Sequence, residues 1–322
     1  MKNVKSILLV GFVLIVAVLV ATCLFGCAKN DAPTPNDNPQ PDANPQPDGH
    51  VKVILLAGQS NAVGYTYDEF DKTPGAYDET RIAKIYEGFE NVKIRFSNNP
   101  YIAGSTNANS EFEPVGLNQG VPKPNAETNS IGPEVGIAEY LLTAFPNETF
   151  YIIKCATGGS NLSYHWSVEN HDAGSLYAQM VEVATGALGQ LEAQGLIPEI
   201  VAFCWMQGES DSYVDDGQSY INGFDALIKQ FEQDFAKYIP EKGMAVIDAG
   251  IKDTPSCWPY YQTINAAKQG YAEESELRFY FDTYDLNLKG NDPAHYDFYG
   301  QLALGNRFGN KIAQAIAIIY AE

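Results

Sequence analysis

The chain has 322 residues, of which 45% are hydrophobic, and its 40 acidic and 20 basic residues give a formal net charge of −20. Such an acidic excess repels nucleic-acid phosphates and anionic lipid headgroups, and it excludes functions that depend on electrostatic binding to either. The five cysteines, an odd number in a chain of this length, do not suit a disulfide framework.

The first 26 residues (1–26) have the pattern of an export signal. Lys2 and Lys5 precede an uncharged apolar run at 7–25, and the sequence "LFGC" then ends at Cys27. This end resembles the cleavage site of a bacterial lipoprotein, which predicts that Cys27 becomes the lipidated first residue. The apolar run is also about long enough to cross a bilayer as an uncleaved anchor. Both alternatives predict an extracytoplasmic protein that is attached to the membrane, or else secreted.

Residues 27–50 are predicted to be a linker. The sequence "NPQPD" occurs at 38–42 and again at 44–48, and no large apolar side chain appears between Ala28 and Val51. A segment so rich in proline, and so poor in apolar side chains, cannot bury a core and is expected to be an extended spacer. The remaining residues, 51–322, are predicted to form one domain.

The domain alternates between apolar runs and helical patterns. The runs predict strands at 51–57, 149–156, 199–206, 244–250 and 277–284, and the patterns predict helices at 133–145, 174–194, 216–238, 259–274 and 297–320. This alternation is typical of a three-layer α/β/α sandwich with a central, mostly parallel five-stranded sheet. The region 80–128 differs, because "RIAKIYEGF" and "VKIRFS" read as paired strands before a Gly/Asn/Ser-rich passage. We expect it to be a small β and loop insertion beside a cleft.

Polar residues follow three of the predicted strands. Ser60 comes after the first strand in "GQSNAVG", Gly158 and Gly159 come after the second, and Gln207 and Glu209 come after the third. Ligands of open parallel sheets bind beyond the carboxyl ends of the strands. These residues are therefore candidates for one site.

A serine hydroxyl becomes a nucleophile only when a base takes its proton. The chain has four histidines: His50 at the end of the linker, His165 and His171 in a loop, and His295 in "NDPAHYDFYG". Asp292 precedes His295 by three residues, a spacing that allows the carboxylate to orient the imidazole from the same loop. Ser60, His295 and Asp292 are thus a candidate set for acyl transfer.

Five sequence blocks together resemble a known superfamily. They are "GQSNAVG", "IGPEVGIA", "KCATGGSNL", "WMQGESD" and "DPAHYDFYGQLALG". With the apolar run that precedes the first of them, they span residues 51–305 in the family's order. The series is similar to the SGNH hydrolases, and more closely to carbohydrate esterase family 6 and the sialate O-acetylesterase-like enzymes. The resemblance implies a flavodoxin-like fold and removal of acetyl groups from carbohydrate, without a metal or an organic cofactor.

Carried onto this sequence, the resemblance makes Ser60 the nucleophile, His295 the general base and Asp292 its orienting acid. Glu209 is an alternative orienting acid, because the usual G-x-N-D block reads Gly-Glu-Ser-Asp here. The implied oxyanion donors are the N–H of Ser60, the N–H of Gly158 or Gly159, and the side-chain amide of Gln207.

The resemblance leaves the substrate open between a neutral acetylated polysaccharide such as xylan and O-acetylated sialic acid. The anionic surface favours the neutral polymer. Asn161, Trp166 and Trp258 are candidate sugar contacts, the two tryptophans because they lie in predicted loops and carry rings suited to sugar faces. A metal site at His165 and His171 is not expected, because their spacing is unusual for metal ligands.

Three alternatives remain open. The chain is compatible with a carbohydrate-binding surface lipoprotein that has kept the fold without activity. It is also compatible with a lipase or thioesterase, although the Asn/Ser/Gly-rich region 97–130 does not suit an apolar acyl channel. A Cys155–Cys204 disulfide requires that the strands carrying them be neighbours.

Overall fold

The fold is seen in a computed structural model that describes residues 49–67, 78–102, 104–122 and 128–321. The predicted signal, Cys27 and all but the end of the linker lie outside these residues and stay predictions. Among the residues that are described, no helix is both long and apolar enough to cross a membrane.

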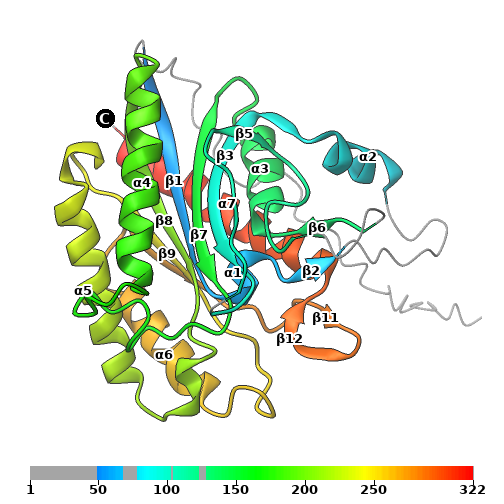
Figure 1. The fold of residues 1–322 in the computed structure, drawn as a ribbon, viewed down its shortest axis with the longest axis vertical. Coiled ribbons are helices and arrows are strands. Elements are labelled where there is room, and N and C mark those ends of the chain that lie inside the picture. Colours follow the sequence, from blue (N-terminus) through cyan, green and yellow to red (C-terminus); the bar gives the residue numbers. More distant parts are fainter. Residues whose placement is uncertain (1–48, 68–77, 103, 123–127, 322) are drawn as a thin grey trace, which may run out of the picture. The chain divides into compact units, whose positions relative to one another are not determined.

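A sheet of eight strands forms the middle layer of the described part (Figure 1). Its order is β10-β9-β8-β1-β7-β3-β4, and β5 pairs with β3 outside this path. The pairs from β10 to β3 are all parallel, whereas β4 and β5 each pair antiparallel with β3. The strands of this sheet are β1 (His50–Gly58), β3 (Phe89–Asn99), β4 (Asn107–Ala108), β5 (Glu113–Val115), β7 (Phe150–Thr157), β8 (Ile197–Met206), β9 (Ala245–Ala249) and β10 (Arg278–Phe281).

The five predicted strands are confirmed, but the region 80–128 is only in part an insertion. Its first segment is a helix, α2 (Glu79–Glu87), which begins where the Asp78 side chain accepts hydrogen bonds from the backbone N–H groups of Thr80 and Arg81. Its second segment, β3, pairs with β7 and so widens the main sheet. The reason is the alternation of Val92, Ile94 and Phe96, whose side chains are all buried.

Helices cover both faces of the sheet (Figure 1). α4 and α5 lie on one face with α6, whereas α3 and α7 pack together on the other. The longer helices agree with the predicted ranges to within a few residues; they are α3 (Pro133–Ala144), α4 (Leu176–Ala193), α5 (Gly217–Asp234), α6 (Tyr261–Ala272) and α7 (Phe298–Ile319). The shorter elements are α1 (Ser60–Val63), β2 (Thr66–Tyr67), β6 (Ser130–Ile131), η1 (Asp211–Tyr213), η2 (Ala236–Tyr238), β11 (Leu288–Lys289) and β12 (Asp292–Tyr296).

The position of β1 in the middle of the sheet determines which turns lie next to the turn that carries Ser60. This strand pairs with β7 on one side and β8 on the other, so the turns that follow β1, β7 and β8 lie side by side at the carboxyl edge. This edge is at the lower end of the sheet in Figure 1. The same order separates Cys155 on β7 from Cys204 on β8 by the width of β1, about 10 Å across two strand spacings. Both cysteines are free and buried, so the disulfide alternative is wrong.

Candidate active site

The turn "GQSNAVG" places Ser60 at the first position of the short helix α1. Gly58 has φ 142°, and a Cβ there would lie 2.0 Å from the carbonyl oxygen of Met206. Gly64 ends α1 in the left-handed region with φ 83°. Both positions therefore require glycine. Ser60 is only 8% exposed and lies just beyond the middle strand.

The residues on either side of Ser60 are buried and anchored to different loops. The Gln59 side-chain oxygen accepts hydrogen bonds from the Gln207 amide and the Ser210 N–H, both at 3.2 Å. The Asn61 amide nitrogen donates to Glu209 Oε1 at 3.0 Å and to the carbonyl oxygen of Ala294 at 3.1 Å. Ser60 is thus held between the turn after β8 and the segment that carries His295.

His295 and Asp292 both lie on β12 and contact each other directly. The distance from His295 Nδ1 to Asp292 Oδ2 is 2.7 Å. The other carboxylate oxygen of Asp292 accepts the N–H of Ala294 at 3.0 Å, and Lys289 Nζ lies 3.1 Å from Oδ2. These contacts fix the imidazole with its Nε2 side away from the carboxylate.

Two residues that the sequence analysis did not single out bring His295 beside Ser60. The Asn61 side chain bonds to both neighbours of His295, because it donates to Ala294 and accepts the N–H of Tyr296 at 3.3 Å. The Tyr65 N–H donates to the carbonyl oxygen of Ser60 at 3.2 Å, while its ring stacks on the imidazole with a centroid distance of 4.7 Å. No direct Ser60–His295 hydrogen bond forms within the described residues. Such bonds often close only when substrate binds.

Glu209, the alternative orienting acid, lies elsewhere. Its side chain is 1% exposed, its Oε1 accepts from Asn61, and its Oε2 has no hydrogen-bond partner among the described residues. Burial raises the pKa of this carboxyl. Glu209 therefore acts on the Asn61 side chain, whereas the carboxylate in contact with His295 belongs to Asp292.

The pKa shifts of His295 and Asp292 suit a histidine that acts as a base in its neutral form. Burial lowers the pKa of His295 despite the opposing effect of Asp292, and the charge of Lys289 lowers it further. Burial acts to raise the pKa of Asp292, but hydrogen bonds from His295, from the Ala294 N–H and from Lys289 outweigh it and lower that pKa to about 2. At neutral pH the site holds an ionised carboxylate beside an uncharged imidazole.

The candidate oxyanion donors differ in whether they are free. The Gly158 N–H donates to the carbonyl oxygen of Asn99 at 3.0 Å, so it is already occupied. The N–H groups of Ser60 and Gly159 have no acceptor among the described residues. Gly159 has φ 71°, and a Cβ there would meet no atom within 4 Å, so its backbone faces open space. Of the two glycines, Gly159 is the one with a free donor.

The Gln207 amide is occupied as well. Its nitrogen lies within hydrogen-bond distance of Asp211 Oδ2 at 2.6 Å, of the Ser160 carbonyl oxygen at 3.1 Å and of Gln59 Oε1 at 3.2 Å. Asp211 also accepts the N–H of Leu162 at 3.0 Å. An amide nitrogen has two hydrogens, so Gln207 links three loops and has no donor to spare for an oxyanion in this arrangement.

Two buried lysines hold the backbone beneath the site. Lys154 on β7 donates to Glu134 at 2.6 Å and to the Val63 carbonyl oxygen, the end of α1, at 2.9 Å. Lys268 on α6 donates to Asp248 at 2.7 Å and to the Gln207 carbonyl oxygen at 2.5 Å. Lys154 and Asp248 interrupt the apolar runs "TFYIIKCA" and "MAVIDAG". A charge inside such a run is the signal that could have revealed these pairs.

The three predicted sugar contacts differ in their exposure to solvent. Trp166 is 1% exposed, packs against Trp205 and donates its indole N–H to Ser160 Oγ at 2.8 Å. It cannot stack on a sugar, so that prediction is wrong; the loop after β7 folds inward to close the core. Asn161 is partly exposed but uses its side-chain oxygen to accept the N–H groups of Tyr164 and His165. Trp258 is partly exposed in the loop before α6.

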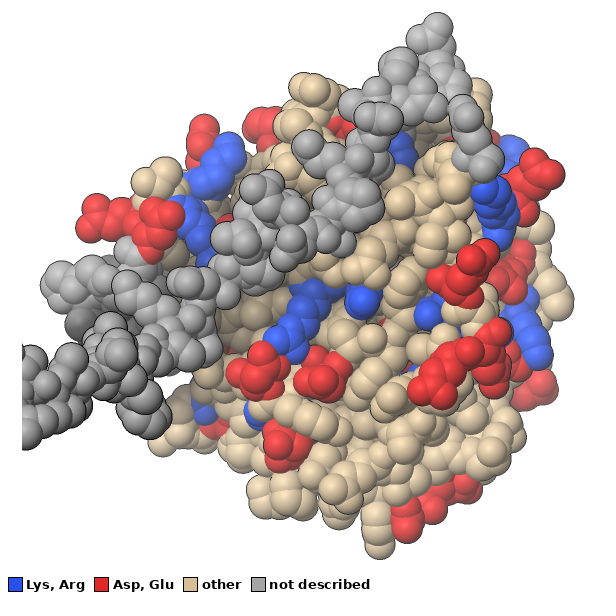
Figure 2. Space-filling model, turned by 180° about the vertical axis from the view of Figure 1, so that it is seen from behind, with Lys and Arg blue, Asp and Glu red and all other residues tan. Residues whose placement is uncertain are grey.

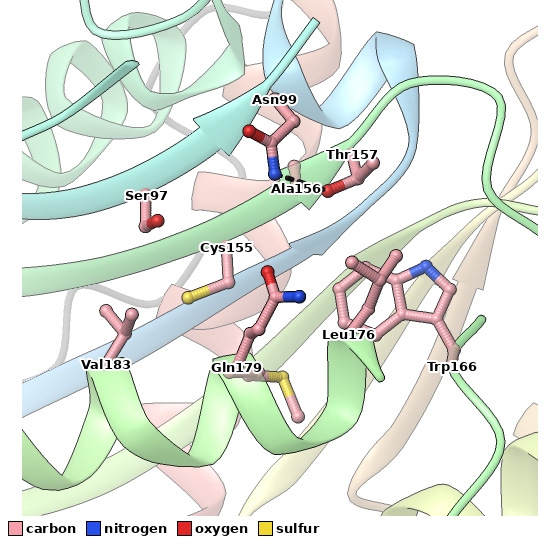
Figure 3. A pocket seen from close by; sticks show the side chains of 10 residues that line it. Ser97, Asn99, Cys155, Ala156, Thr157, Trp166, Leu176, Gln179 and Val183 are labelled. Atoms are coloured by element: carbon pink, nitrogen blue, oxygen red, sulfur yellow. Dashed lines mark hydrogen bonds between the residues drawn. The ribbon is translucent and has the colours of Figure 1, made fainter. Parts of the chain in front are cut away.

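A small cavity lies beside Trp166 between the sheet and α4 (Figure 3). The Cys155 and Gln179 side chains point into it, and its volume is about 10 Å³, room for about one water molecule. Neither Ser60 nor His295 lines it. The cavity is therefore too small for a sugar and separate from the candidate site. Within the described residues, no three His, Cys, Asp or Glu side chains are grouped to hold a metal.

Comparison with known proteins supports the fold and the family. A family described as carbohydrate esterase, sialic acid-specific acetylesterase, matches residues 50–314. No curated protein sequence matches the chain. A solved structure from Arabidopsis thaliana is similar with a TM-score of 0.58 and 20% identity, covering 81% of this chain and 97% of that one. A structure named NanS is similar with a TM-score of 0.58 and 17% identity, covering 83% and 98%.

Proposed function

The chain belongs to the family of sialic acid-specific acetylesterases among the carbohydrate esterases, and on this basis we propose that Ser60 is the nucleophile that removes the acetyl group. Family membership makes the protein a carbohydrate acetylesterase, a carboxylic ester hydrolase. The observation that carries the assignment of roles is the 2.7 Å contact of Asp292 with His295 on a segment that Asn61 ties to the serine turn. We assign His295 as general base and Asp292 as its orienting acid.

The proposed reaction has two halves. His295 Nε2 takes the proton of Ser60 as its oxygen attacks the acetyl carbonyl, and the oxyanion that forms accepts hydrogen bonds from the N–H groups of Ser60 and Gly159. His295 then returns the proton to the departing sugar oxygen and leaves an acetyl-serine. Water, deprotonated by His295, attacks this ester, and the proton passes back to Ser60 as acetate leaves.

A neutral acetylated polysaccharide, xylan-like in its lack of charge, is the proposed substrate. An acidic sugar needs an unpaired cation near Ser60, but the lysines that the described segments bring near this edge are paired with carboxylates. These pairs are Lys154 with Glu134, Lys268 with Asp248, Lys289 with Asp292, and Lys252 with Asp253. The family description supports O-acetylated sialic acid as the second candidate.

A substrate panel tests this choice. Acetate release from acetylated xylan, mannan, pectin and O-acetylated sialoglycan is measured together with hydrolysis of p-nitrophenyl acetate and p-nitrophenyl octanoate. We expect kcat/KM for acetylated xylan to exceed that for the sialoglycan by about tenfold or more. The reverse order identifies a sialate esterase, a preference for octanoate identifies a lipase or thioesterase, and sugar binding without turnover identifies a binding protein.

The proposal places the enzyme outside the cytoplasm. It rests on the basic and apolar pattern of residues 1–26, on "LFGC" before Cys27, and on the proline-rich linker that follows. The mass of the protein extracted from membranes decides the matter: a chain that begins at a lipidated Cys27 supports the anchor, and a full-length chain supports the uncleaved alternative.

Replacing Lys289 by methionine is expected to move the acidic limb of the kcat/KM profile to higher pH. His295 works as a base only when neutral, so activity falls as the pH drops through its pKa. The charge of Lys289 lowers that pKa, and its removal lets the imidazole hold a proton at higher pH. The profile is measured with p-nitrophenyl acetate, with Lys242→Met at the exposed Lys242 as control. An unchanged limb, or a shift to lower pH, contradicts this account.

A further inference from the structure

Exposed apolar side chains gather at the carboxyl edge of the sheet. Within the described part of the chain, ten large apolar side chains are exposed, and seven of them lie in segments that directly follow a strand of the main sheet. The seven are Tyr101, Ile102, Tyr164, Tyr213, Val214, Tyr260 and Tyr284. The other three, Tyr86, Ile197 and Tyr320, lie away from these segments. Single exposed apolar residues are ordinary, but this concentration at one edge is not.

On the side of β8, two adjoining loops carry four side chains, which we name the aromatic shelf: Tyr213, Val214, Trp258 and Tyr260. Tyr213 is 60% exposed, and its ring meets the edge of the Trp258 ring with centroids 6.1 Å apart. The Tyr260 N–H donates to the Ser212 carbonyl oxygen at 2.9 Å, which joins the segments after β8 and β9. The shelf is therefore a built surface made by two loops.

On the other side of Ser60, the segment after β3 carries Tyr101. Tyr101 is 59% exposed, and its segment is tied to the glycine turn by a hydrogen bond from the Ile102 N–H to the Gly158 carbonyl oxygen at 3.1 Å. The loop after β7, which carries Tyr164, instead reaches the side of β8, where the Leu162 N–H donates to Asp211 and Trp166 packs on Trp205. The Tyr164 hydroxyl donates to Asp172 at 2.8 Å, which restrains its ring while 53% of the residue stays exposed. Aromatic rings therefore flank the serine turn on both sides.

The distance between the rings after β3 and those after β9 is long enough for a chain of several sugars. β3 and β9 are separated by β7, β1 and β8, and four strand spacings amount to about 19 Å. This length exceeds a single sugar ring and accommodates several in a row. Tyrosine suits such a surface, because its ring packs on an apolar sugar face while its hydroxyl stays in water. The lower end of the face seen in Figure 2 is also mostly free of charged side chains.

We infer that the substrate binds as a chain of linked, uncharged sugars that crosses the carboxyl edge. One end lies on the aromatic shelf and the other on Tyr101, so that an acetyl group in the middle of the chain meets Ser60. This inference rests on the proposed function and adds to it that the enzyme is specific for a polymer through rings remote from the reacting atoms.

The test uses the full chain and the double variant Tyr101→Ala/Tyr213→Ala. We expect the ratio of kcat/KM on acetylated xylan to kcat/KM on p-nitrophenyl acetate to fall about tenfold or more, since the variant loses a stacked ring at each end of the bound sugar chain. Tyr101→Phe/Tyr213→Phe should restore most of this ratio. Tyr86→Ala and Tyr320→Ala, at residues 48% and 44% exposed but away from the edge, should not change it.

A second measurement separates this inference from the proposed function. In a Ser60→Ala background, binding to acetylated xylan is measured by retardation in a gel that contains the polymer, and the same double substitution should weaken it about tenfold or more. Equal loss of activity on both substrates, or undiminished polymer binding, overturns the inference. If the wild type binds the polymer through these rings but hydrolyses no ester, the proposed function fails and the inferred surface stands.

Discussion

Ser60→Ala is expected to lower kcat on p-nitrophenyl acetate and on acetylated xylan by about 10⁴-fold or more. The variant keeps the backbone N–H donors and the His295–Asp292 pair but has no oxygen to carry the acetyl group. The fold should not change, because the Ser60 hydroxyl makes no hydrogen bond among the described residues, whereas Gln59 and Asn61 beside it hold the turn.

Steady-state kinetics and thermal unfolding check this prediction together. Ser163→Ala is a matched control, because Ser163 is exposed in the loop after β7 and has no part in the proposed reaction. We expect it to keep normal kcat and KM. A Ser60→Ala enzyme that keeps a substantial part of its activity, with an unchanged unfolding temperature, would require a different nucleophile.

Asp292→Asn is expected to cost about 10³–10⁴ in kcat, while Glu209→Gln should cost less than about tenfold. An asparagine at 292 can hold the imidazole in the wrong tautomer and cannot stabilise the cation that forms during proton transfer. Glu209 contacts Asn61 through one oxygen, and a glutamine oxygen can accept the same hydrogen bond. The two carboxyls therefore differ in role: Asp292 is partly exposed and contacts His295, whereas Glu209 is buried and contacts Asn61.

The measurement is kcat for both variants across a pH range, since a change in the tautomer or pKa of His295 also changes the shape of the profile. We expect the profile of Glu209→Gln to keep the wild-type shape. A larger loss of kcat in Glu209→Gln than in Asp292→Asn would make Glu209 the orienting acid. Equal losses would mean that both carboxyls orient His295.

Prediction from the sequence was most successful for features that a short stretch of the chain encodes by itself. The apolar runs predicted the five strands, because a strand covered on both faces needs near-continuous apolar side chains. The D-x-x-H spacing predicted that Asp292 reaches His295, and the structure places them 2.7 Å apart. Both predictions concern residues close together in the chain.

Prediction was weaker where a residue's role depends on distant segments. Asn61 reads as an ordinary turn residue, and its bonds to Glu209 and Ala294 exist only because the turns after β1 and β8 meet each other and β12. Trp166 reads as a loop aromatic, yet the loop turns it into the core against Trp205. The helix at 79–87 was expected to be a strand, since the apolar residues of "RIAKIYEGF" fit both the two-residue period of a strand and the 3.6-residue period of a helix.

The amino-acid sequence was thus sufficient for the α/β class, for the family blocks and for the serine, histidine and aspartate proposed to act, because each is encoded in a short stretch. Only the tertiary structure decided which glycine N–H is free, that the Gln207 amide is occupied, and that exposed tyrosines flank the serine turn on both sides. The physical reason is that hydrogen-bond donors and exposed surfaces are shared among loops far apart in the chain. The order of the strands in the sheet determines which of those loops meet.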